Sequence, residues 1–378
     1  MKLNTTNYNK YSAMLLLSLC LCMPLKAASG IGGFLHKVGA FIDKSTVKGI
    51  DTTYIGVPEK PWQFMVRGFS DYATIHMNSH LFSDDNVFSF DWEPSIKTGF
   101  SNLYGVWVGY RGYGIGFSYN PRPNKRSEKG FSLSLGGSQY GLSLKINRFK
   151  NTEASVKLTD FDNKEAEPYL GDITLDDPMS IKTVLVDAYY ELNGKHYSNT
   201  ASYDQSVIQL RSAGSPLIAL SWFQGEVDYA SNKNALFLTL MNDVGKFKFS
   251  QACIGAGYAY NWVPWPNRVS SKPRLKQGRL LVNAMAAPML SVYNRVKTWL
   301  YDYDFESDIE NAAIKEKGTE TIHSRLAVNF TARLAVVYNL DPWFGVANAQ
   351  FNRYGYKHKP VDSDLTFWNF SASIGYRF

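Results

Sequence analysis

The chain has 378 residues, of which 40 are Lys or Arg and 33 are Asp or Glu, with a formal net charge of +7; 45% are hydrophobic and 15% aromatic. This aromatic content excludes a disordered or low-complexity chain. The length suits two ordinary domains or one large all-β barrel. Only 3 cysteines are present, two of them near the N-terminus, so an internal disulfide or a cysteine-based zinc site is excluded from the rest of the chain.

The N-terminus has the pattern of an export signal. Lys2 and Lys10 precede the apolar stretch 13–25, which is too short to span a bilayer, and small residues follow at 27–29. We therefore expect residues 1–27 to be a secretory signal peptide that is removed. Three lysines leave with it, so 37 basic residues face 33 acidic ones, and this balance of +4 gives no reason to expect a nucleic-acid partner.

Residues 28–60 are expected to form a periplasmic N-terminal extension. Within it, the stretch 34–48 places apolar side chains on one face of a short helix, which would lie in the periplasm or enter a barrel as a plug. The side chains on that face are Phe34, Leu35, Val38, Phe41 and Ile42.

From residue 61 onward the dominant pattern has a period of two. Apolar side chains alternate with polar ones, as in a strand with one apolar and one wet face. No apolar run after residue 27 reaches 18 residues, so a transmembrane helix is not expected. Slips in phase near Arg111-Gly112 and Gly136-Gly137 predict β-bulges or hairpin tips. The predicted strands are 62–76, 88–100, 102–120, 130–149, 181–193, 201–211, 215–225, 246–262, 279–294, 324–338, 343–357 and 365–378.

The length of these runs favours a membrane barrel over a soluble β-sandwich. Many last about 11–20 residues, whereas soluble strands average about five or six and a bilayer-crossing strand needs about 9–11. In hydrocarbon every backbone N–H and C=O must be paired, so a spanning sheet closes on itself. The sequence therefore predicts an all-β fold, an antiparallel transmembrane (outer-membrane) β-barrel of about 12 strands (about 10–14) over residues 61–378.

Long polar connections are expected at 77–86, 150–180, 226–245 and 301–321. Outer-membrane barrels have short periplasmic turns and long outer loops. With both termini in the periplasm, the strand count puts 150–180 at the periplasmic end, against this rule. The side chains expected to face the lumen carry both signs, so no ion selectivity follows from them. They are Asp91, Glu93, Lys97, Arg325 and Arg333.

The last strand ends in a terminal aromatic residue preceded by apolar side chains at every second position. This pattern resembles the C-terminal signature of bacterial outer-membrane β-barrel proteins, which implies that the barrel-assembly machinery is a partner during biogenesis. The residues that carry the resemblance are Trp368, Phe370, Ile374, Tyr376 and Phe378.

Four stretches resemble a Bacteroidota family of exported, outer-membrane-barrel-like proteins that is known only as a domain of unknown function. They are residues 51–55 (DTTYI), 110–116 (YRGYGIG), 209–215 (QLRSAGS) and 255–258 (GAGY). The resemblance implies a Gram-negative lineage and an outer-membrane location. It implies no catalytic residue.

The glycines at 112, 114 and 116 superficially suggest a nucleotide-binding loop. A dinucleotide fingerprint needs a strand, then the glycines, then the start of a helix. Here Ile115 and Phe117 continue the strand alternation. We therefore expect small residues on the lumen side, or a bulge.

Six histidines are present, and two groups of them would suit an outer-membrane hydrolase or acyltransferase. These are His76 with Ser79 and His80, and His323 with Ser324. Adjacent strand residues point to opposite faces, which argues against a couple between His323 and Ser324. Polar roles in loops or in the lumen are the preferred explanation.

One acidic and one basic cluster lie in expected connections. The acidic cluster would suit Ca²⁺ or bridging to lipopolysaccharide, but it lacks EF-hand spacing, and a solvated outer loop is expected. The basic cluster, beside Trp262 and Trp265, is expected at the periplasmic rim near anionic headgroups. The acidic set is Asp302, Asp304, Glu306, Asp308 and Glu310, and the basic set is Arg268, Lys272, Arg274, Lys276 and Arg279.

We predict from these patterns a structural outer-membrane barrel or a narrow passive pore, with outer-membrane lipid and lipopolysaccharide as partners. No cofactor and no enzymatic activity are expected. Two alternatives remain open on the sequence: a lipid-modifying outer-membrane enzyme, and a soluble secreted β-sheet binding protein.

Overall fold

The computed structural model describes residues 30–82, 89–97, 100–122, 128–160, 169–241, 243–265, 278–304, 313–323, 326–358 and 361–378. The chain divides into two compact units, residues 1–44 and residues 45–378. The described part of the first unit lies in helix α2 (Gly30–Val47), which covers the stretch where a helix is expected. No helix in the described ranges is both long and apolar enough to cross a membrane.

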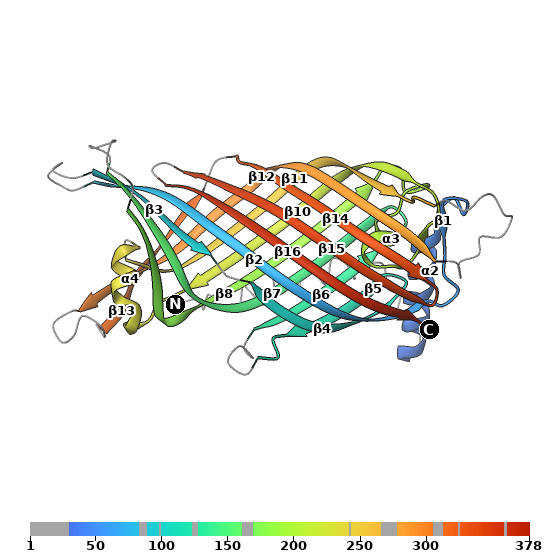
Figure 1. Cartoon of the computed structure of the whole chain (residues 1–378), viewed down its shortest axis with the longest axis horizontal. Coiled ribbons are helices and arrows are strands. Elements are labelled where there is room, and N and C mark those ends of the chain that lie inside the picture. The colour runs from blue at the N-terminus through green and yellow to red at the C-terminus, as the bar shows by residue number, and fades with distance from the viewer. Residues whose placement is uncertain are drawn as a thin grey trace. The chain divides into compact units, whose positions relative to one another are not determined.

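The second unit is a closed antiparallel β-barrel (Figure 1). Each strand of the ring pairs with the ring strands before and after it in sequence, and the last, β16, pairs with the first, β2. The prediction of an all-β antiparallel barrel of about twelve strands is therefore confirmed. The strands of the ring are β2 (Trp62–Phe82), β4 (Ser101–Tyr110), β5 (Tyr113–Tyr119), β6 (Lys129–Gly136), β7 (Tyr140–Asp160), β8 (Tyr169–Glu191), β10 (Ala213–Asp228), β11 (Val244–Trp262), β12 (Arg279–Asp304), β14 (Val328–Leu340), β15 (Trp343–His358) and β16 (Val361–Arg377).

Two further strands extend the wall at the end away from the C-terminus. Strand β3 (Ser89–Lys97) pairs with β2 and β7, and β13 (Ala313–His323) pairs with the end of β12. Lys97 of β3 lies opposite Thr74, whereas Ser101 of β4 lies opposite Asp71, so β3 and β4 follow one another along the same edge of β2. Beyond the end of β3, toward the C-terminal end of the barrel, β4, β5 and β6 form the wall between β2 and β7.

Two long predicted strands are in fact hairpins. The stretch 102–120 folds back at Arg111 and Gly112, whose φ angles of 51° and 84° are those of the tight turn that joins two right-twisted strands. The stretch 130–149 likewise splits into β6 and β7. The phase slips in the sequence thus mark hairpin tips rather than bulges.

Two other predictions are wrong. The stretch 201–211 is not a wall strand, because it contains helix α3 (Thr200–Tyr203) and the two-residue strand β9 (Ile208–Gln209). Most of the stretch 150–180 is not a loop, because β7 continues to Asp160 and β8 begins at Tyr169. Their connection lies at the end opposite the C-terminus, so the apparent exception to the loop rule disappears.

The polarity of the wall places the core inside the ring. On β10, Leu217 and Ala219 point inward and are 3% and 1% exposed, whereas Ile218 and Leu220 point outward and are 44% and 51% exposed. Adjacent strand residues face opposite sides of a sheet, so this alternation separates an apolar outer surface from an enclosed interior.

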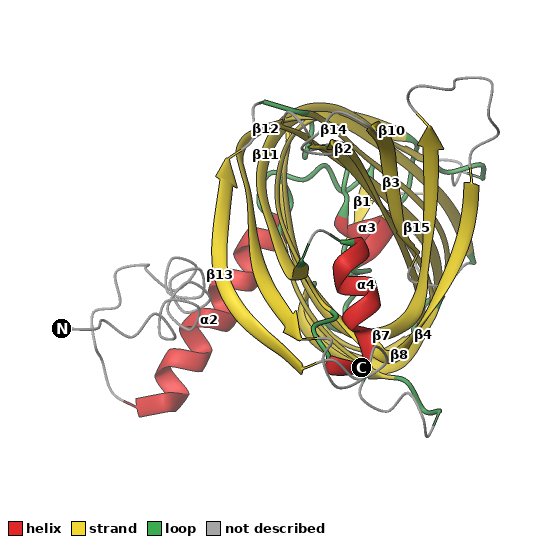
Figure 2. Cartoon of the chain, turned by 90° about the vertical axis from the view of Figure 1, so that its left-hand side faces the viewer, coloured by secondary structure: helices red, strands yellow, loops and turns green. Residues whose placement is uncertain are grey.

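Two parts of the chain outside the ring strands fold into that interior. The first, which we call the plug, comprises residues 48–58 and 192–212 and includes α3 and the pairing of β1 (Ile55–Gly56) with β9. The second, which we call the cap, comprises residues 229–243 with the 3-10 turn η3 (Asn232–Asn234) and helix α4 (Ala235–Leu240). Figure 2 shows α3 and α4 within the ring of strands.

Candidate functional site

The plug is built from two of the stretches that resemble the exported family. Ile55 lies opposite Gln209, and Leu210 N donates to Tyr54 O at 2.7 Å. The buried Gln209 side chain joins the two segments and orders the second: Nε2 donates to Tyr54 O at 3.4 Å and to His196 O at 2.7 Å, and Oε1 accepts from the backbone N of Ser198 at 3.1 Å. The stretches 51–55 and 209–215 are therefore parts of one structural element.

The plug is fixed to the wall by the last strand. Arg377 is 0% exposed, and its Nη2 donates to Gln205 O at 3.1 Å and to Asn339 Oδ1 at 2.7 Å. Its guanidinium also lies over the ring of Phe344, 4.5 Å from the centroid. Because a buried charge needs partners on all sides, Arg377 ties the plug to both β14 and β16.

The glycines of β4 and β5 make room for an indole ring. A Cβ at Gly109 or Gly114 would lie 2.0 or 2.2 Å from the side chain of Trp107, so only glycine fits beneath it. Trp107 Nε1 donates to Ser134 Oγ at 3.2 Å, and the guanidinium of Arg67 lies 4.8 Å above the ring. These glycines serve packing and hold no phosphate loop.

Above the plug, an ion pair crosses the interior. Asp187 of β8 accepts from Arg333 Nη2, from Gln350 Nε2 at 3.1 Å and from Ser221 Oγ at 2.8 Å. Both charged side chains are almost fully buried, at 5% and 7% exposure. Arg333 also lies over the ring of Tyr189, at 4.7 Å. The pair therefore joins β8 to the opposite strand β14 through the middle of the barrel.

The other end of the interior is filled by apolar side chains. Phe237 and Leu238 of the cap are buried against Phe149, Met179 and other inward residues of β7, β8, β10 and β11. Nearer the middle, aromatic rings fill the space, with Phe223 stacked on Tyr354 at 4.7 Å. Plug, ion pair, aromatic layer and cap together occupy successive levels of the lumen in the described part of the barrel.

A small cavity remains between the wall and the plug. Its volume is about 90 Å³, and it is lined by Arg67, Lys145, Arg333, Tyr203 and Asp204 together with serine side chains of β6, β7 and β16. A neighbouring cavity of about 40 Å³ shares Arg67 and Lys145 with it. These basic residues lie on predicted strands, but the sequence gives no signal that β2 and β7 bring them together.

Asp204, which follows α3 in the plug, has a pKa raised to about 6. The main cause is the removal of water from its half-buried carboxyl, and the charges of Arg67 and Arg333 and a hydrogen bond from Ser134 only partly offset it. The folded state therefore holds a proton more tightly than the unfolded state does.

This predicts that Asp204→Asn stabilises the barrel at neutral pH. Because the folded pKa is raised, the wild type loses stability as pH rises from about 4 to about 6, and above that range the full penalty is present. The penalty is of the order of 2 kcal/mol after allowing for partial exposure. Unfolding titrations in detergent should show a higher free energy of unfolding for the variant than for the wild type at neutral pH, and this difference should vanish near pH ~4. A difference that does not change with pH would contradict this account.

The predicted assembly residues lie at the seam that closes the ring. Trp368, Phe370, Ile374 and Phe378 are 38%, 42%, 66% and 51% exposed, so they point outward from β16. The backbone N of Phe378 donates to Trp62 O at 3.0 Å, and Trp62 N donates to Phe378 O at 3.3 Å, which pairs the end of the chain with β2. Tyr376 packs edge-on against Trp343 at 4.9 Å.

Of the five predicted lumen-facing residues, the structure places one. Arg333 is buried in the interior. The side chains of Asp91, Glu93 and Lys97 in β3 and the whole of Arg325 lie outside the described part of the chain.

The proposed histidine, acidic and basic groupings fall mostly outside the described residues. His76 and His323 are exposed, but the side chains of Ser79 and His80 and all of Ser324 lie outside the description. Of the acidic cluster, Asp302 pairs with Lys317 at 3.1 Å, and of the basic cluster only Arg279 is described, as a buried residue. Where the structure describes the chain, no three His, Cys, Asp or Glu side chains gather as a metal site requires.

A pair between His196 and Asp51 in the plug was not predicted from the sequence. His196 Nε2 lies 3.5 Å from Asp51 Oδ2, and its ring packs against Tyr54 at 4.5 Å. Asp51 also accepts from the N and Oγ1 of Thr53 at 2.9 and 2.7 Å, and these bonds lower the pKa of its carboxyl. Asp51 and Tyr54 belong to one quoted stretch, but only the fold brings His196 to them.

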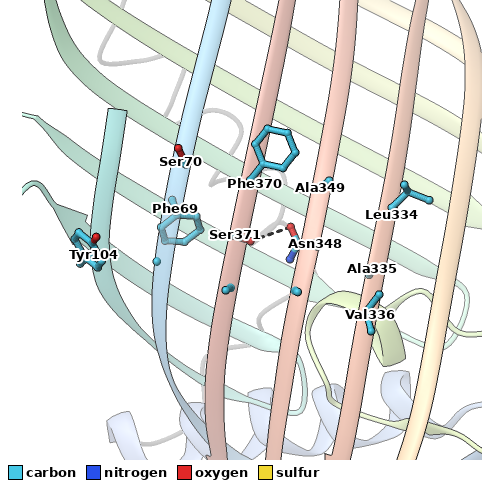
Figure 3. Close-up of a pocket in the computed structure, with 13 residues that line it drawn as sticks. Phe69, Ser70, Tyr104, Leu334, Ala335, Val336, Asn348, Ala349, Phe370 and Ser371 are labelled. Carbon is cyan, nitrogen blue, oxygen red and sulfur yellow. Dashed lines mark hydrogen bonds between the residues drawn. The ribbon is translucent and has the colours of Figure 1, made fainter. Parts of the chain in front are cut away.

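The outer surface has a shallow apolar groove of about 530 Å³ across β2, β16, β15 and β14 (Figure 3). Small residues line its floor, and Tyr104, Leu334, Val336 and Phe370 border it. A hydrogen bond of 2.9 Å from Ser371 Oγ to Asn348 Oδ1 lies beneath the floor, on the inner side of the wall. The groove is thus a depression in the apolar outer face.

Comparison with known proteins gives a family. The family described as "Domain of unknown function (DUF4421)" matches residues 49–378. No curated protein matches the chain. Solved structures similar to it include the outer membrane protease OmpT from Escherichia coli (8% identity, TM-score 0.35, 84% of this chain and 97% of that chain). Two others are the β domain of the Bordetella autotransporter BrkA (10%, 0.31, 84% and 100%) and the P. putida toluene transporter TodX (8%, 0.22, 89% and 94%).

Proposed function

This chain belongs to the family described as a domain of unknown function (DUF4421), and we propose that it is an outer-membrane β-barrel with a closed interior and a structural role. The observation that carries the proposal is the continuous apolar band on the outside of the ring. Soluble monomers rarely expose contiguous apolar patches larger than a few hundred Å².

The height of the band matches a bilayer. On β16 the outward side chains from Trp368 to Phe378 are apolar or small, and ten residues at about 3.3 Å each, tilted by about 40°, span about 25 Å. Aromatic residues mark both of its edges: Trp62, Trp343 and Phe378 at one end and Trp368 at the other. Aromatic belts of this kind sit at the two membrane interfaces.

Charged side chains begin where the band ends. Arg148, Lys182, Glu226, Lys248 and Lys297 lie directly opposite one another on β7, β8, β10, β11 and β12. Lys182 Nζ lies 3.0 Å from Glu226 Oε1. A row of charges on five adjacent strands supports a polar boundary at this level, with the cap and the extended strands outside the membrane.

The closed interior favours a structural barrel over the narrow passive pore. Ions would pass only if the plug, the cap and the aromatic layer between them no longer filled the lumen. We further propose that the chain has no catalytic role, since the His196–Asp51 pair in the described part of the plug contacts Tyr54 and Thr53 and is used for packing. The last strand is proposed to carry the assembly signal, with Phe378 at the seam.

The proposal predicts a depth-dependent cost for charge on the outer face. Leu334 is the middle one of the outward residues of β14 and Leu340 is the last, and they are 57% and 45% exposed. Leu334→Arg should lower the free energy of unfolding in lipid vesicles by about 2–4 kcal/mol, and Leu340→Arg by about 0–1 kcal/mol. Denaturant titrations of both variants measure this difference.

The same pair of variants distinguishes a soluble barrel. If water surrounded the ring, both substitutions would replace exposed leucines and each would change stability by about 0.5 kcal/mol or less. Equal, small effects together with recovery of the protein without detergent would therefore refute the membrane assignment.

A further inference from the structure

The cavity between wall and plug is lined by two cations that form no ion pair with a described residue, although the carboxyl of Asp204 lines the same cavity. We propose that it binds a small oxyanion of the size of sulfate or phosphate, held between Arg67 of β2 and Lys145 of β7. Both residues line this cavity and its smaller neighbour, so their charges meet at the same place. The inference stands apart from the structural role proposed above, because it concerns what the closed interior holds.

Among the described residues, neither Arg67 nor Lys145 forms an ion pair. Lys145 Nζ donates to Gln350 Oε1 at 3.2 Å and to Asn369 Oδ1 at 3.1 Å, which are neutral amide oxygens. Arg67 Nη2 has the sulfur of Met65 as an acceptor at 3.5 Å. Both side chains are partly buried. Charges that lose part of their water are ordinarily paired with opposite charges, so two such cations at one cavity favour the binding of an anion there.

The carboxylates of the interior are engaged elsewhere. Asp187 is paired with Arg333. Asp71 accepts from Asn147 Nδ2 at 2.8 Å and from Asn369. Asp204 lines the cavity and its carboxyl accepts a hydrogen bond from Ser134, and Asp71 lines the smaller neighbouring cavity.

The cavity has the size and the donors for an oxyanion. Its volume of about 90 Å³ equals about three water molecules at ~30 Å³ each. Besides the two cations it is lined by hydroxyl groups that form no side-chain hydrogen bond within the described residues: those of Ser132, Ser143 and Ser373. Cations and hydroxyls that converge on one point are the donor set that tetrahedral oxyanions accept.

The geometry of Arg67 is fixed before any ligand arrives. Its guanidinium lies over Trp107, and Trp107 is itself seated on Gly109 and Gly114. A donor that is already oriented loses little freedom on binding. This explains why the wall here is made of glycine and serine: larger side chains would fill the cavity and displace the indole.

Thermal unfolding of the purified barrel in detergent tests the proposal, with sodium sulfate compared against sodium chloride at equal ionic strength. Sulfate should raise the unfolding midpoint of the wild type, because a ligand that binds only the folded state stabilises it. Arg67→Gln and Lys145→Gln should each weaken sulfate binding by about tenfold or more. Lys145→Arg keeps the charge and should keep most of the effect.

Arg353→Gln is the matched control, because Arg353 lies on the outer side of the wall and pairs with Asp364 at 2.9 Å. It should respond to sulfate as the wild type does. No sulfate effect on the wild type, or an equal effect on all four variants, would overturn the proposal. Equilibrium dialysis with labelled sulfate gives the same comparison for any variant whose midpoint is too low to follow.

A pH arm separates this cavity from a general surface effect. Asp204 faces Arg67 and Arg333 across the cavity, and its carboxylate competes with a bound anion. Sulfate should therefore bind the wild type more tightly near pH ~5 than near pH ~7, a range in which Lys145 stays mostly charged, and Asp204→Asn should remove most of this dependence. An Asp204→Asn variant with the pH dependence of the wild type would count against the assigned place.

Discussion

Asp187→Ala is expected to lower the free energy of unfolding by about 3–5 kcal/mol, because it leaves the Arg333 guanidinium buried without its anion. Asp187 is 3% exposed and is the only carboxylate that Arg333 contacts among the described residues. The substitution also leaves Gln350 Nε2 and Ser221 Oγ without the acceptor that they share. Guanidinium titrations of the barrel in detergent or vesicles measure the loss.

The double variant Asp187→Ala, Arg333→Met tests whether the cost arises from the unpaired charge. Removing both partners should recover most of the stability, since an apolar pair of similar volume replaces two buried charges. Asp364→Ala is the control, because it breaks the exposed pair with Arg353 and should cost less than about 1 kcal/mol. A double variant as unstable as the single one would show that Asp187 acts through its other hydrogen bonds.

Removing plug and cap together, in a Phe223→Ala, Tyr354→Ala background that also opens the aromatic layer, is expected to convert a closed barrel into a conducting one. The variant replaces residues 196–210 and 230–241 by short Gly-Ser linkers, which removes Gln205, Gln209 and the helices α3 and α4. The inward side chains of a twelve-strand wall then face water along the lumen. Planar-bilayer recordings should show stepwise currents for this double deletion.

The two single deletions are the controls for that recording. Each leaves one end filled, so each should stay closed, as should the wild type. Heat-modifiable gel mobility shows whether the ring has formed in each variant. Steady currents through the wild type would contradict the closed interior and favour the narrow passive pore. A folded double deletion without currents would show that inward wall residues alone close the lumen.

The sequence predicts the class of fold because the outer face repeats one simple rule. Lipid-facing positions are apolar at every second residue, and the run lengths exceed those of soluble strands. The strand count of twelve is correct through two compensating differences. The stretches 102–120 and 130–149 each contain two ring strands, whereas 88–100 contributes only β3, outside the ring, and 201–211 contributes the plug.

Hairpin tips are marked in the sequence only by short slips in phase, which a β-bulge would also produce. Arg111 and Gly112 interrupt the pattern by only two residues, and their positive φ angles are visible only in the fold. The prediction of a wall strand at 201–211 is wrong because residues of the plug can show the same alternation. The alternating side chains of this stretch are buried on all sides within the barrel, and Val207, Ile208 and Leu210 are 2%, 1% and 5% exposed.

The interior is less predictable than the wall because its contacts join residues far apart in the chain. Asp187 and Arg333 are 146 positions apart, and Arg377 meets Gln205 across 172. Alternation shows that Arg333 faces inward, but it does not show which acid lies opposite. The cavity at Arg67 and Lys145 likewise depends on how the plug sits against β2 and β7.

Spin-label accessibility along β10 tests the central claim most directly. Single cysteines at positions 216–223 of the folded protein in vesicles, in a Cys253→Ala background, would carry a nitroxide exposed either to oxygen in lipid or to a polar reagent in water. We predict that labels at 216, 218, 220 and 222 collide with oxygen and that those at 217, 219, 221 and 223 are shielded from it. Outward labels that collide with the polar reagent instead would show that water, and not lipid, surrounds the ring.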